Sequence, residues 1–153
     1  MGTAANPVVE QPSSETTSDQ VEALLEAARY DDLDDVVSLA SSGVSLDSKD
    51  SLGRTALHMA AANGHLDVVE YLINRGVDLN AINEEKNTPL HWACLNGHIE
   101  VVKKLILAGA NVTELNSYER TPMDEAVSGG KMDVIDAINA AVAQLELTGV
   151  SVS

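Results

Sequence analysis

The chain has 153 residues and a mass of 16.1 kDa, which leaves room for one domain or a short array of repeats. Hydrophobic residues make up 44% of it, but aromatic residues make up only 3% and phenylalanine is absent, so an aliphatic core is expected that favours helix packing over a β-sandwich. The formal net charge of -15 argues against direct binding of nucleic acid, because phosphate binding needs clustered cations. A partner selected by charge would therefore be basic, although the acidity is equally consistent with a role in solubility alone.

The cellular setting is indicated by cysteine content and by the lack of apolar runs. Cys94 is the single cysteine and has no partner for an internal disulfide, which suits a reducing compartment. The amino-terminal letters MGTAANPVVE do not form a signal peptide, and no segment approaches 18 unbroken apolar residues. We expect a monomeric protein of the cytoplasm and nucleus that does not associate with membranes.

The first segment in chain order is residues 1–19. It contains Pro7, Pro12 and most of the polar run SSETTSDQ, and it shows no hydrophobic period. Such a segment has too little apolar surface to offset the entropy of ordering. We predict that residues 1–19 form a disordered acidic arm.

The rest of the chain is dominated by an internal repeat of 33 residues. The letters TALHMAAANGH at 55–65 recur as TPLHWACLNGH at 88–98, and a third copy, TPMDEAVSGGK, occupies 121–131. A degenerate earlier copy aligns with the same register. The sequence therefore predicts four repeats at 20–52, 53–85, 86–118 and 119–145, followed by a short tail at 146–153.

A 33-residue period with the T-P-L-H-x-A motif resembles the ankyrin repeat, in which a β-turn precedes two antiparallel helices. The resemblance implies an all-α solenoid of four stacked helix-turn-helix repeats with β-turn fingers. Threonine can cap a helix and proline fits its first turn, so first helices are expected at about 55–63, 88–96 and 121–128. Glycines then separate them from second helices at about 66–74, 99–107 and 132–140.

Some positions depart from the repeat pattern. The last repeat has Asp124 in place of the usual histidine, and polar replacements in terminal repeats are typical of caps that face water. Lys86 and Glu119 stand where Gly53 supplies the usual turn glycine. We therefore expect the fingers that contain Lys86 and Glu119 to differ in shape from the one that contains Gly53.

Catalytic or metal-binding chemistry has little support in the sequence. The four histidines follow the 33-residue period, which favours structural roles, and no zinc, EF-hand, phosphate-loop or hydrolase motif is present. Cys94 takes a small-residue position of the repeat, which favours a buried thiol over a nucleophile. The acidic run formed by Asp31, Asp32, Asp34 and Asp35 is either a solvated face or a binding patch. We expect no enzyme activity, no cofactor and no metal.

A binding surface is the remaining candidate for function. In an ankyrin stack, the turn tips and inner helices line a concave groove, so the register predicts which side chains face it. The predicted contact residues are Arg29, Tyr30, Leu52, Arg54, Met59, Asn63, Glu84, Glu85, Asn87, Trp92, Leu95, Asn96, Tyr118, Arg120 and Glu125. Trp, Tyr and Arg are common interface hot spots, but Trp92 is also placed where it can pack between neighbouring helices.

A narrower resemblance concerns residues 55–65 and 87–98. In a small acidic protein, these two blocks are similar to those of the yeast-type ankyrin-repeat chaperones that escort a newly made basic protein of the small ribosomal subunit. The resemblance implies a chaperone-like escort that masks a basic ribosomal protein during ribosome biogenesis. The alternative is a generic ankyrin adaptor or inhibitor of a signalling or transcription protein, which would accept a neutral partner as readily as a basic one.

Overall fold

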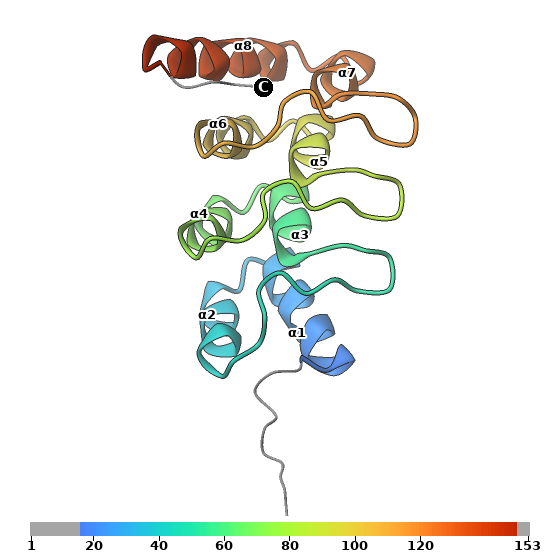
Figure 1. Cartoon of the computed structure of the whole chain (residues 1–153), viewed down its shortest axis with the longest axis vertical. Coiled ribbons are helices and arrows are strands. Elements are labelled where there is room, and N and C mark those ends of the chain that lie inside the picture. Colours follow the sequence, from blue (N-terminus) through green and yellow to red (C-terminus); the bar gives the residue numbers. More distant parts are fainter. Residues whose placement is uncertain (1–15, 150–153) are drawn as a thin grey trace, which may run out of the picture.

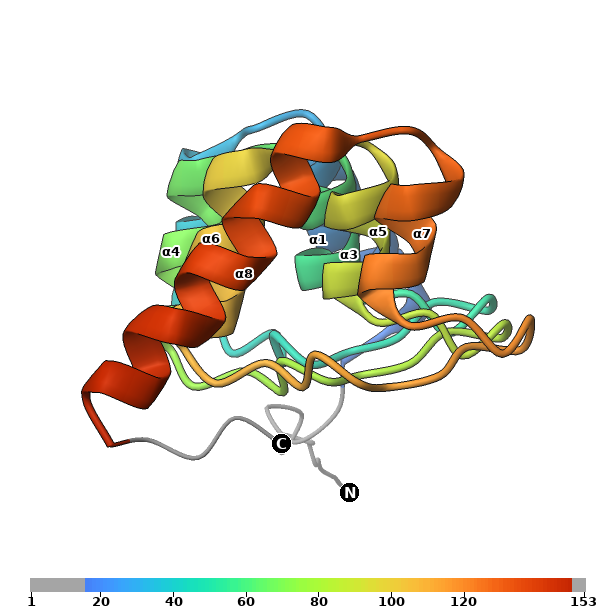
Figure 2. The ribbon, with the colours of Figure 1, turned by 90° about the horizontal axis from the view of Figure 1, so that it is seen from above.

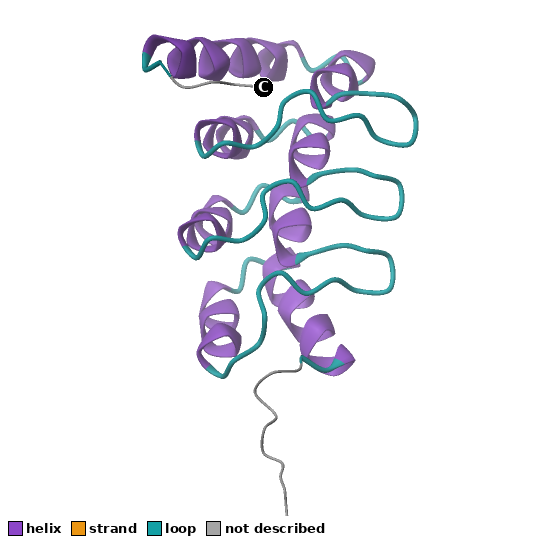
Figure 3. Cartoon of the chain, viewed as in Figure 1, coloured by secondary structure: helices purple, strands orange, loops and turns teal. Residues whose placement is uncertain are grey.

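The structure, a computed structural model, describes residues 16–149 and consists of paired antiparallel helices. In chain order the pairs are α1 Ser18–Arg29 with α2 Leu33–Ser41, α3 Ala56–Ala62 with α4 Leu66–Asn74, α5 Pro89–Leu95 with α6 Ile99–Leu107, and α7 Pro122–Ser128 with α8 Met132–Leu147. Residues 16–149 contain eight helices and no strand (Figure 3). The prediction of an all-α repeat architecture is confirmed.

The helices form two columns, and extended loops project from one side of them. Helices α1, α3, α5 and α7 stack in the inner column, each packed on the next, while α2, α4, α6 and α8 form the outer column (Figure 1). The long loops between successive repeats run past the inner column and lie above one another, as the view from above shows (Figure 2). The inner helices and these loops together form an L-shaped surface along the stack.

The inner helices begin at a repeated threonine cap. The hydroxyls of Thr55, Thr88 and Thr121 each accept a hydrogen bond from the backbone N–H three residues later. The side chain of that later residue accepts a bond from the threonine N–H in return, which completes a capping box. Because this cap recurs every 33 residues, α3, α5 and α7 start at the same position of their repeats, whereas α1 begins at its own cap, Thr17.

The core between the columns is aliphatic and closely packed. Ala60, Ala93 and Ala126 are fully buried at equivalent positions of the inner helices, and their small side chains allow neighbouring repeats to approach closely. Leu72 and Leu105 on the outer helices are also fully buried. The near absence of aromatic residues therefore follows from the close spacing of the stack.

The three loop tips have the same turn conformation, although the sequence predicted different shapes for the tips that contain Lys86 and Glu119. We call these loops finger 50–54, finger 83–87 and finger 116–120. Backbone φ is 77° at Gly53, 62° at Lys86 and 61° at Glu119, so all three residues take the left-handed conformation. The expected difference in shape is wrong.

The reason is a side-chain oxygen at the start of each finger. Oδ1 of Asp50 accepts hydrogen bonds from the backbone N–H groups of Leu52 and Arg54, at 3.0 and 2.9 Å. Asn83 and Asn116 make the equivalent pair of bonds in their own fingers. These bonds hold the turn whether or not glycine occupies its left-handed position.

Two helix boundaries differ from the sequence prediction. Helix α1 starts at Ser18, because Thr17 and Gln20 form a capping box, so residues 16–19 belong to the folded chain instead of the predicted arm. Residues 1–15 of that arm lie outside the described residues. Helix α8 runs to Leu147, beyond the predicted 132–140 and into the predicted tail. Val142 stands where Gly76 and Gly109 end the earlier outer helices, and it packs against the core.

None of the helices within residues 16–149 combines the length and the apolar character needed to cross a membrane. The longest helix, α8, has 16 residues. A helix needs about 20 predominantly apolar residues to span the hydrocarbon layer of a bilayer.

A matched pair of glycine substitutions tests the packing between repeats. Gly64 and Gly76 have similar positive φ, 73° and 79°, but a Cβ at Gly64 would lie 2.5 Å from Nδ1 of His98, whereas nothing lies within 4 Å at Gly76. We expect Gly76→Ala to lower the free energy of unfolding by about 1–2 kcal/mol through backbone strain. Gly64→Ala should lower the free energy of unfolding by about 1–2 kcal/mol more than Gly76→Ala does, because the His98 ring must leave the Ala62 carbonyl.

Urea denaturation followed by circular dichroism measures both values. Equal losses of stability in the two variants would contradict this account of how His98 packs.

Candidate functional site

Two histidines of the inner helices, His58 in α3 and His91 in α5, connect their repeats to the next finger. Nε2 of His58 donates a hydrogen bond to the Asn87 carbonyl at 2.8 Å, and Nε2 of His91 donates to the Arg120 carbonyl at 2.9 Å. The Nδ1 atoms accept from the backbone N–H of Thr55 and Thr88, so both rings are neutral with the proton on Nε2. The predicted structural role of these histidines is confirmed.

The second pair of histidines connects each repeat to the one before it. Nε2 of His65 donates to the Arg29 carbonyl at 2.7 Å, and Nε2 of His98 donates to the Ala62 carbonyl at 2.9 Å. Both acceptors lie in the last turn of an inner helix, whose terminal carbonyl groups lack a partner within the helix. The four histidine side chains are therefore engaged in holding the stack together.

Burial shifts the pKa of three groups in the interior, His58, Cys94 and His91, and the pKa of His91 is lowered. The other two shifts are larger. Burial lowers the pKa of His58 to about 4, against the opposing effect of the hydrogen bond to Asn87. Burial also raises the pKa of the Cys94 thiol to about 12, so this thiol stays protonated at neutral pH. The predicted buried cysteine is confirmed.

The acidic run in the first repeat caps a helix. Oδ1 of Asp32 accepts from the backbone N–H of Asp35 at 3.1 Å at the start of α2, where negative charge favours the helix. The neighbouring Asp32 carboxylate raises the pKa of Asp35. Within residues 16–149 no group of three or more His, Cys, Asp or Glu side chains is arranged to hold a metal ion.

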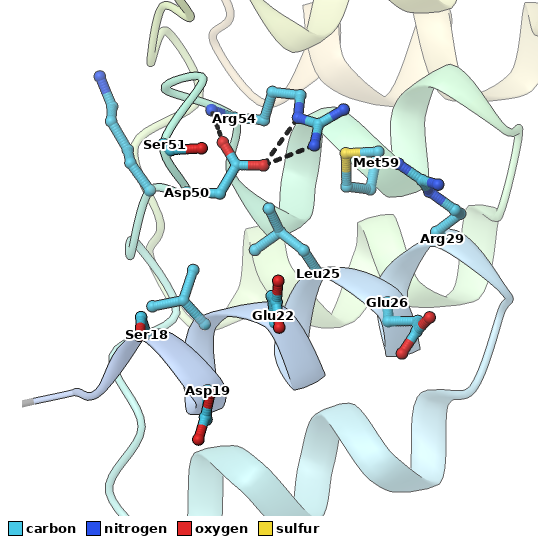
Figure 4. A pocket seen from close by; sticks show the side chains of 12 residues that line it. Ser18, Asp19, Glu22, Leu25, Glu26, Arg29, Asp50, Ser51, Arg54 and Met59 are labelled. Carbon is cyan, nitrogen blue, oxygen red and sulfur yellow. Dashed lines mark hydrogen bonds and ion pairs between the residues drawn. The ribbon is translucent and has the colours of Figure 1, made fainter.

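The concave side of the stack contains a large hollow at its amino-terminal end, which we call the α1 hollow. It has a volume of about 560 Å³ and lies between α1, finger 50–54 and the first turn of α3 (Figure 4). Its lining residues are Ser18, Asp19, Val21, Glu22, Leu25, Glu26, Arg29, Lys49, Asp50, Ser51, Arg54 and Met59. Four carboxylates and three cations thus line the hollow together with apolar side chains.

An ion pair fixes the wall of the α1 hollow. The Arg54 guanidinium bonds Oδ2 of Asp50 through Nε at 2.8 Å and Nη2 at 2.7 Å, as the dashed lines in Figure 4 show. Partial burial of Asp50 opposes its ionisation, but the hydrogen bonds from the Arg54 side chain and backbone outweigh this and lower its pKa. The charge of Arg54 is therefore compensated inside the finger.

A second hollow continues the groove along the stack, and we call it the Trp92 slot. It has a volume of about 290 Å³ and is lined by Leu52, Arg54, Asn83, Glu84, Glu85 and Trp92. Arg54 lines both hollows, so they lie next to each other. Trp92 is half-buried and meets His58 edge-to-face, with ring centroids 5.3 Å apart, so it both packs in the stack and lines the slot.

Most of the predicted contact residues are accessible. Tyr30, Leu52, Leu95 and Tyr118 are 66%, 46%, 42% and 61% exposed. The exposed polar members are Asn63, Glu84, Glu85, Asn96 and Arg120, while Arg29, Arg54 and Trp92 are half-buried. Their role as partner contacts stays a prediction.

Three predicted contact residues are buried instead: Met59, Asn87 and Glu125. The Nδ2 group of Asn116 donates to Oδ1 of Asn87 at 2.8 Å and to Oε2 of Glu125 at 2.7 Å. Glu125 also pairs with Arg120 at 3.6 Å. Asn87 and Glu125 therefore support finger 116–120 from behind, and Met59 forms part of the floor of the α1 hollow.

The sequence prediction missed the contribution of α1 to the groove. Asp19, Glu22, Leu25 and Glu26 line the α1 hollow, but only Arg29 and Tyr30 were predicted from the first repeat. A signal was present, because Glu26 precedes the predicted Met59 by 33 residues. The degenerate sequence of α1 concealed this correspondence.

The comparison with protein families agrees with this geometry. A family model for ankyrin repeats, in three copies, matches residues 24–116, which is more than half of the chain. The chain belongs to the ankyrin-repeat family. Ankyrin-repeat proteins are generally non-enzymatic protein-interaction modules, and we describe this ankyrin protein as a protein-binding module. A comparison with curated proteins finds no match.

The buried neutral His58 predicts a dependence of stability on pH. Its pKa is about 4 in the folded ankyrin stack and about 6.5 when unfolded, so the unfolded chain binds more protons between these values. The stabilising contribution is complete above pH 6.5 and is lost as pH falls toward 4. We expect the free energy of unfolding to fall by about 2 kcal/mol between pH 7 and pH 5 on account of this group.

Urea denaturation at both pH values, in the wild type and in His58→Gln, measures this contribution. The variant should lose about 2 kcal/mol less than the wild type over the same interval, whatever its stability at pH 7. Equal losses in the two proteins would show that His58 is not the titrating group.

Proposed function

We propose that this ankyrin-repeat protein is a chaperone-like escort that masks a basic protein of the small ribosomal subunit during ribosome biogenesis. The observation that carries the proposal is the composition of the concave groove, where exposed apolar side chains lie among carboxylates. Leu52, Glu84 and Glu85 illustrate this pattern in the Trp92 slot. The similarity of residues 55–65 and 87–98 to the yeast-type escort proteins supports the same partner class.

The charges of the groove fit a cationic partner. Asp19, Glu22 and Glu26 line the α1 hollow, and Glu84 and Glu85 line the Trp92 slot. With a net charge of -15 over the whole chain, the protein attracts positively charged proteins over distances of about one Debye length. Attraction of this kind raises the rate of association and selects partners by charge.

The proposed mechanism is competitive masking. A ribosomal protein binds RNA through Lys and Arg side chains that contact phosphates. Carboxylates of the groove occupy the same side chains before assembly, while Trp92, Leu95 and Tyr118 cover apolar surface. The RNA, with its higher density of negative charge, displaces the escort when the ribosomal protein reaches its site.

The proposal includes the setting of this process. A monomeric escort in the cytoplasm and nucleus would accompany its partner from synthesis to assembly. The ankyrin protein needs no cofactor or metal for this role, because binding and release depend on surface charge and apolar contact alone.

Affinity capture at two salt concentrations tests the partner class. We expect the tagged protein to retain one basic small-subunit ribosomal protein from its own cell extract at 50 mM salt, and to lose most of it at 300 mM salt, because salt screens exposed charges. Mass spectrometry identifies the retained proteins. Capture of a neutral signalling or transcription protein that resists salt would support the generic adaptor instead.

A matched pair of leucine variants tests the groove with the purified ribosomal protein. Leu95, at the end of α5, is a predicted contact residue and is 42% exposed, whereas Leu107 at the end of α6 lines a hollow of the outer column and is 38% exposed. We expect Leu95→Ala to weaken binding about fivefold to thirtyfold, and Leu107→Ala to leave it unchanged. Isothermal titration calorimetry measures both affinities, and equal effects would place the interface elsewhere.

A further inference from the structure

The Trp92 slot has a larger excess of negative charge than the α1 hollow once the Asp50–Arg54 ion pair is set aside. Glu84 and Glu85 are both exposed, and the ion pairs found among residues 16–149 involve neither of them. The cation in the slot is Arg54, which already pairs with Asp50. In the α1 hollow, by contrast, the same pair leaves three carboxylates, Asp19, Glu22 and Glu26, and two cations, Arg29 and Lys49.

The slot is also held rigidly. The backbone N–H of Glu84 donates to the Leu52 carbonyl at 3.0 Å and joins the two fingers that form its walls. The Glu85 carboxylate accepts from the Tyr118 hydroxyl at 3.3 Å, and Trp92 rests against His58. A partner side chain therefore enters a preformed site and orders few protein groups on binding.

The size and composition of the slot select one kind of side chain. A volume of about 290 Å³ lies at the lower end of the range of small-ligand pockets and leaves room for one long side chain. Trp92 and Leu52 give the slot apolar surface, and Glu84 and Glu85 are its acidic lining residues. An arginine guanidinium stacks on an indole ring and bonds carboxylates in a planar, bidentate manner, which a lysine ammonium does not do.

We propose that the Trp92 slot is a specific binding site for one arginine side chain of the protein partner, held between the Trp92 indole and the carboxylates of Glu84 and Glu85. The inference rests on the proposed function to the extent that the partner is basic. It adds that arginine is preferred over lysine, and it identifies the place in the groove where the preference arises.

Trp92 provides a direct probe, because it is the only tryptophan in the chain. Its indole N–H gives a single resonance in a nitrogen-proton correlation spectrum. We expect this resonance to shift saturably with the peptide acetyl-Gly-Arg-Gly-amide, with an affinity on the order of millimolar. The lysine peptide should bind about threefold to tenfold more weakly, and the neutral citrulline peptide at least tenfold more weakly.

A charge-matched pair of variants distinguishes binding in the Trp92 slot from attraction by the overall negative charge of the protein. Glu84→Gln with Glu85→Gln removes two carboxylates from the slot, and Glu22→Gln with Glu26→Gln removes two from the α1 hollow. All four side chains are exposed, so both proteins should fold. We expect the slot variant to lose the preference for arginine over citrulline and the α1 variant to keep it.

Three results would overturn the inference: no saturable shift, equal binding of arginine and citrulline peptides, or equal effects of the two double variants. The peptide measurement is independent of the ribosomal partner. If the arginine peptide binds as expected but no ribosomal protein is captured, the slot stands and the proposed function fails. If the ribosomal protein is captured but the peptides show no preference, the slot fails and the proposed function stands.

Discussion

The hydrogen bond from a buried histidine to the next finger determines most of what this ankyrin protein presents to a partner. Nε2 of His58 reaches the Asn87 carbonyl, and Nε2 of His91 reaches the Arg120 carbonyl. Each bond joins an inner helix to the finger of the following repeat. Bonds inside the scaffold thus help to place the fingers that line the groove.

The same bond explains why the interior tolerates polar groups. A buried imidazole is costly unless both ring nitrogens are paired, and here the threonine cap and the next finger pair them. The last inner helix has no following finger within the described chain, and its equivalent residue, Asp124, serves only the Thr121 cap. Asp124 thus keeps the hydrogen bonds of the threonine cap and lacks the hydrogen bond to a following finger.

The groove has fixed fingers and an uneven distribution of charge. Asx turns fix the fingers, and the Asp50–Arg54 pair cancels one of the cations that would otherwise repel a basic partner. What remains is a mixed-charge hollow beside α1 and a slot beside Trp92 whose two carboxylates belong to none of the ion pairs within residues 16–149. The proposed arginine site would make this surface sensitive to the position of a single positive charge as well as to total charge.

The amino-acid pattern was enough to predict the repeat, the all-α class and the starts of α3, α5 and α7, because a 33-residue period with threonine caps depends on local interactions. It also indicated much of the groove, since the register fixes which positions face inward. The packing of the repeats was needed to show that Asn87 and Glu125 are buried beneath a finger and that α1 contributes carboxylates to the groove, because a pattern in the sequence does not show which face of a residue a neighbouring repeat covers. The fingers containing Lys86 and Glu119 keep the turn of Gly53 for a local reason, since Asp50, Asn83 and Asn116 bond backbone N–H groups of their own fingers.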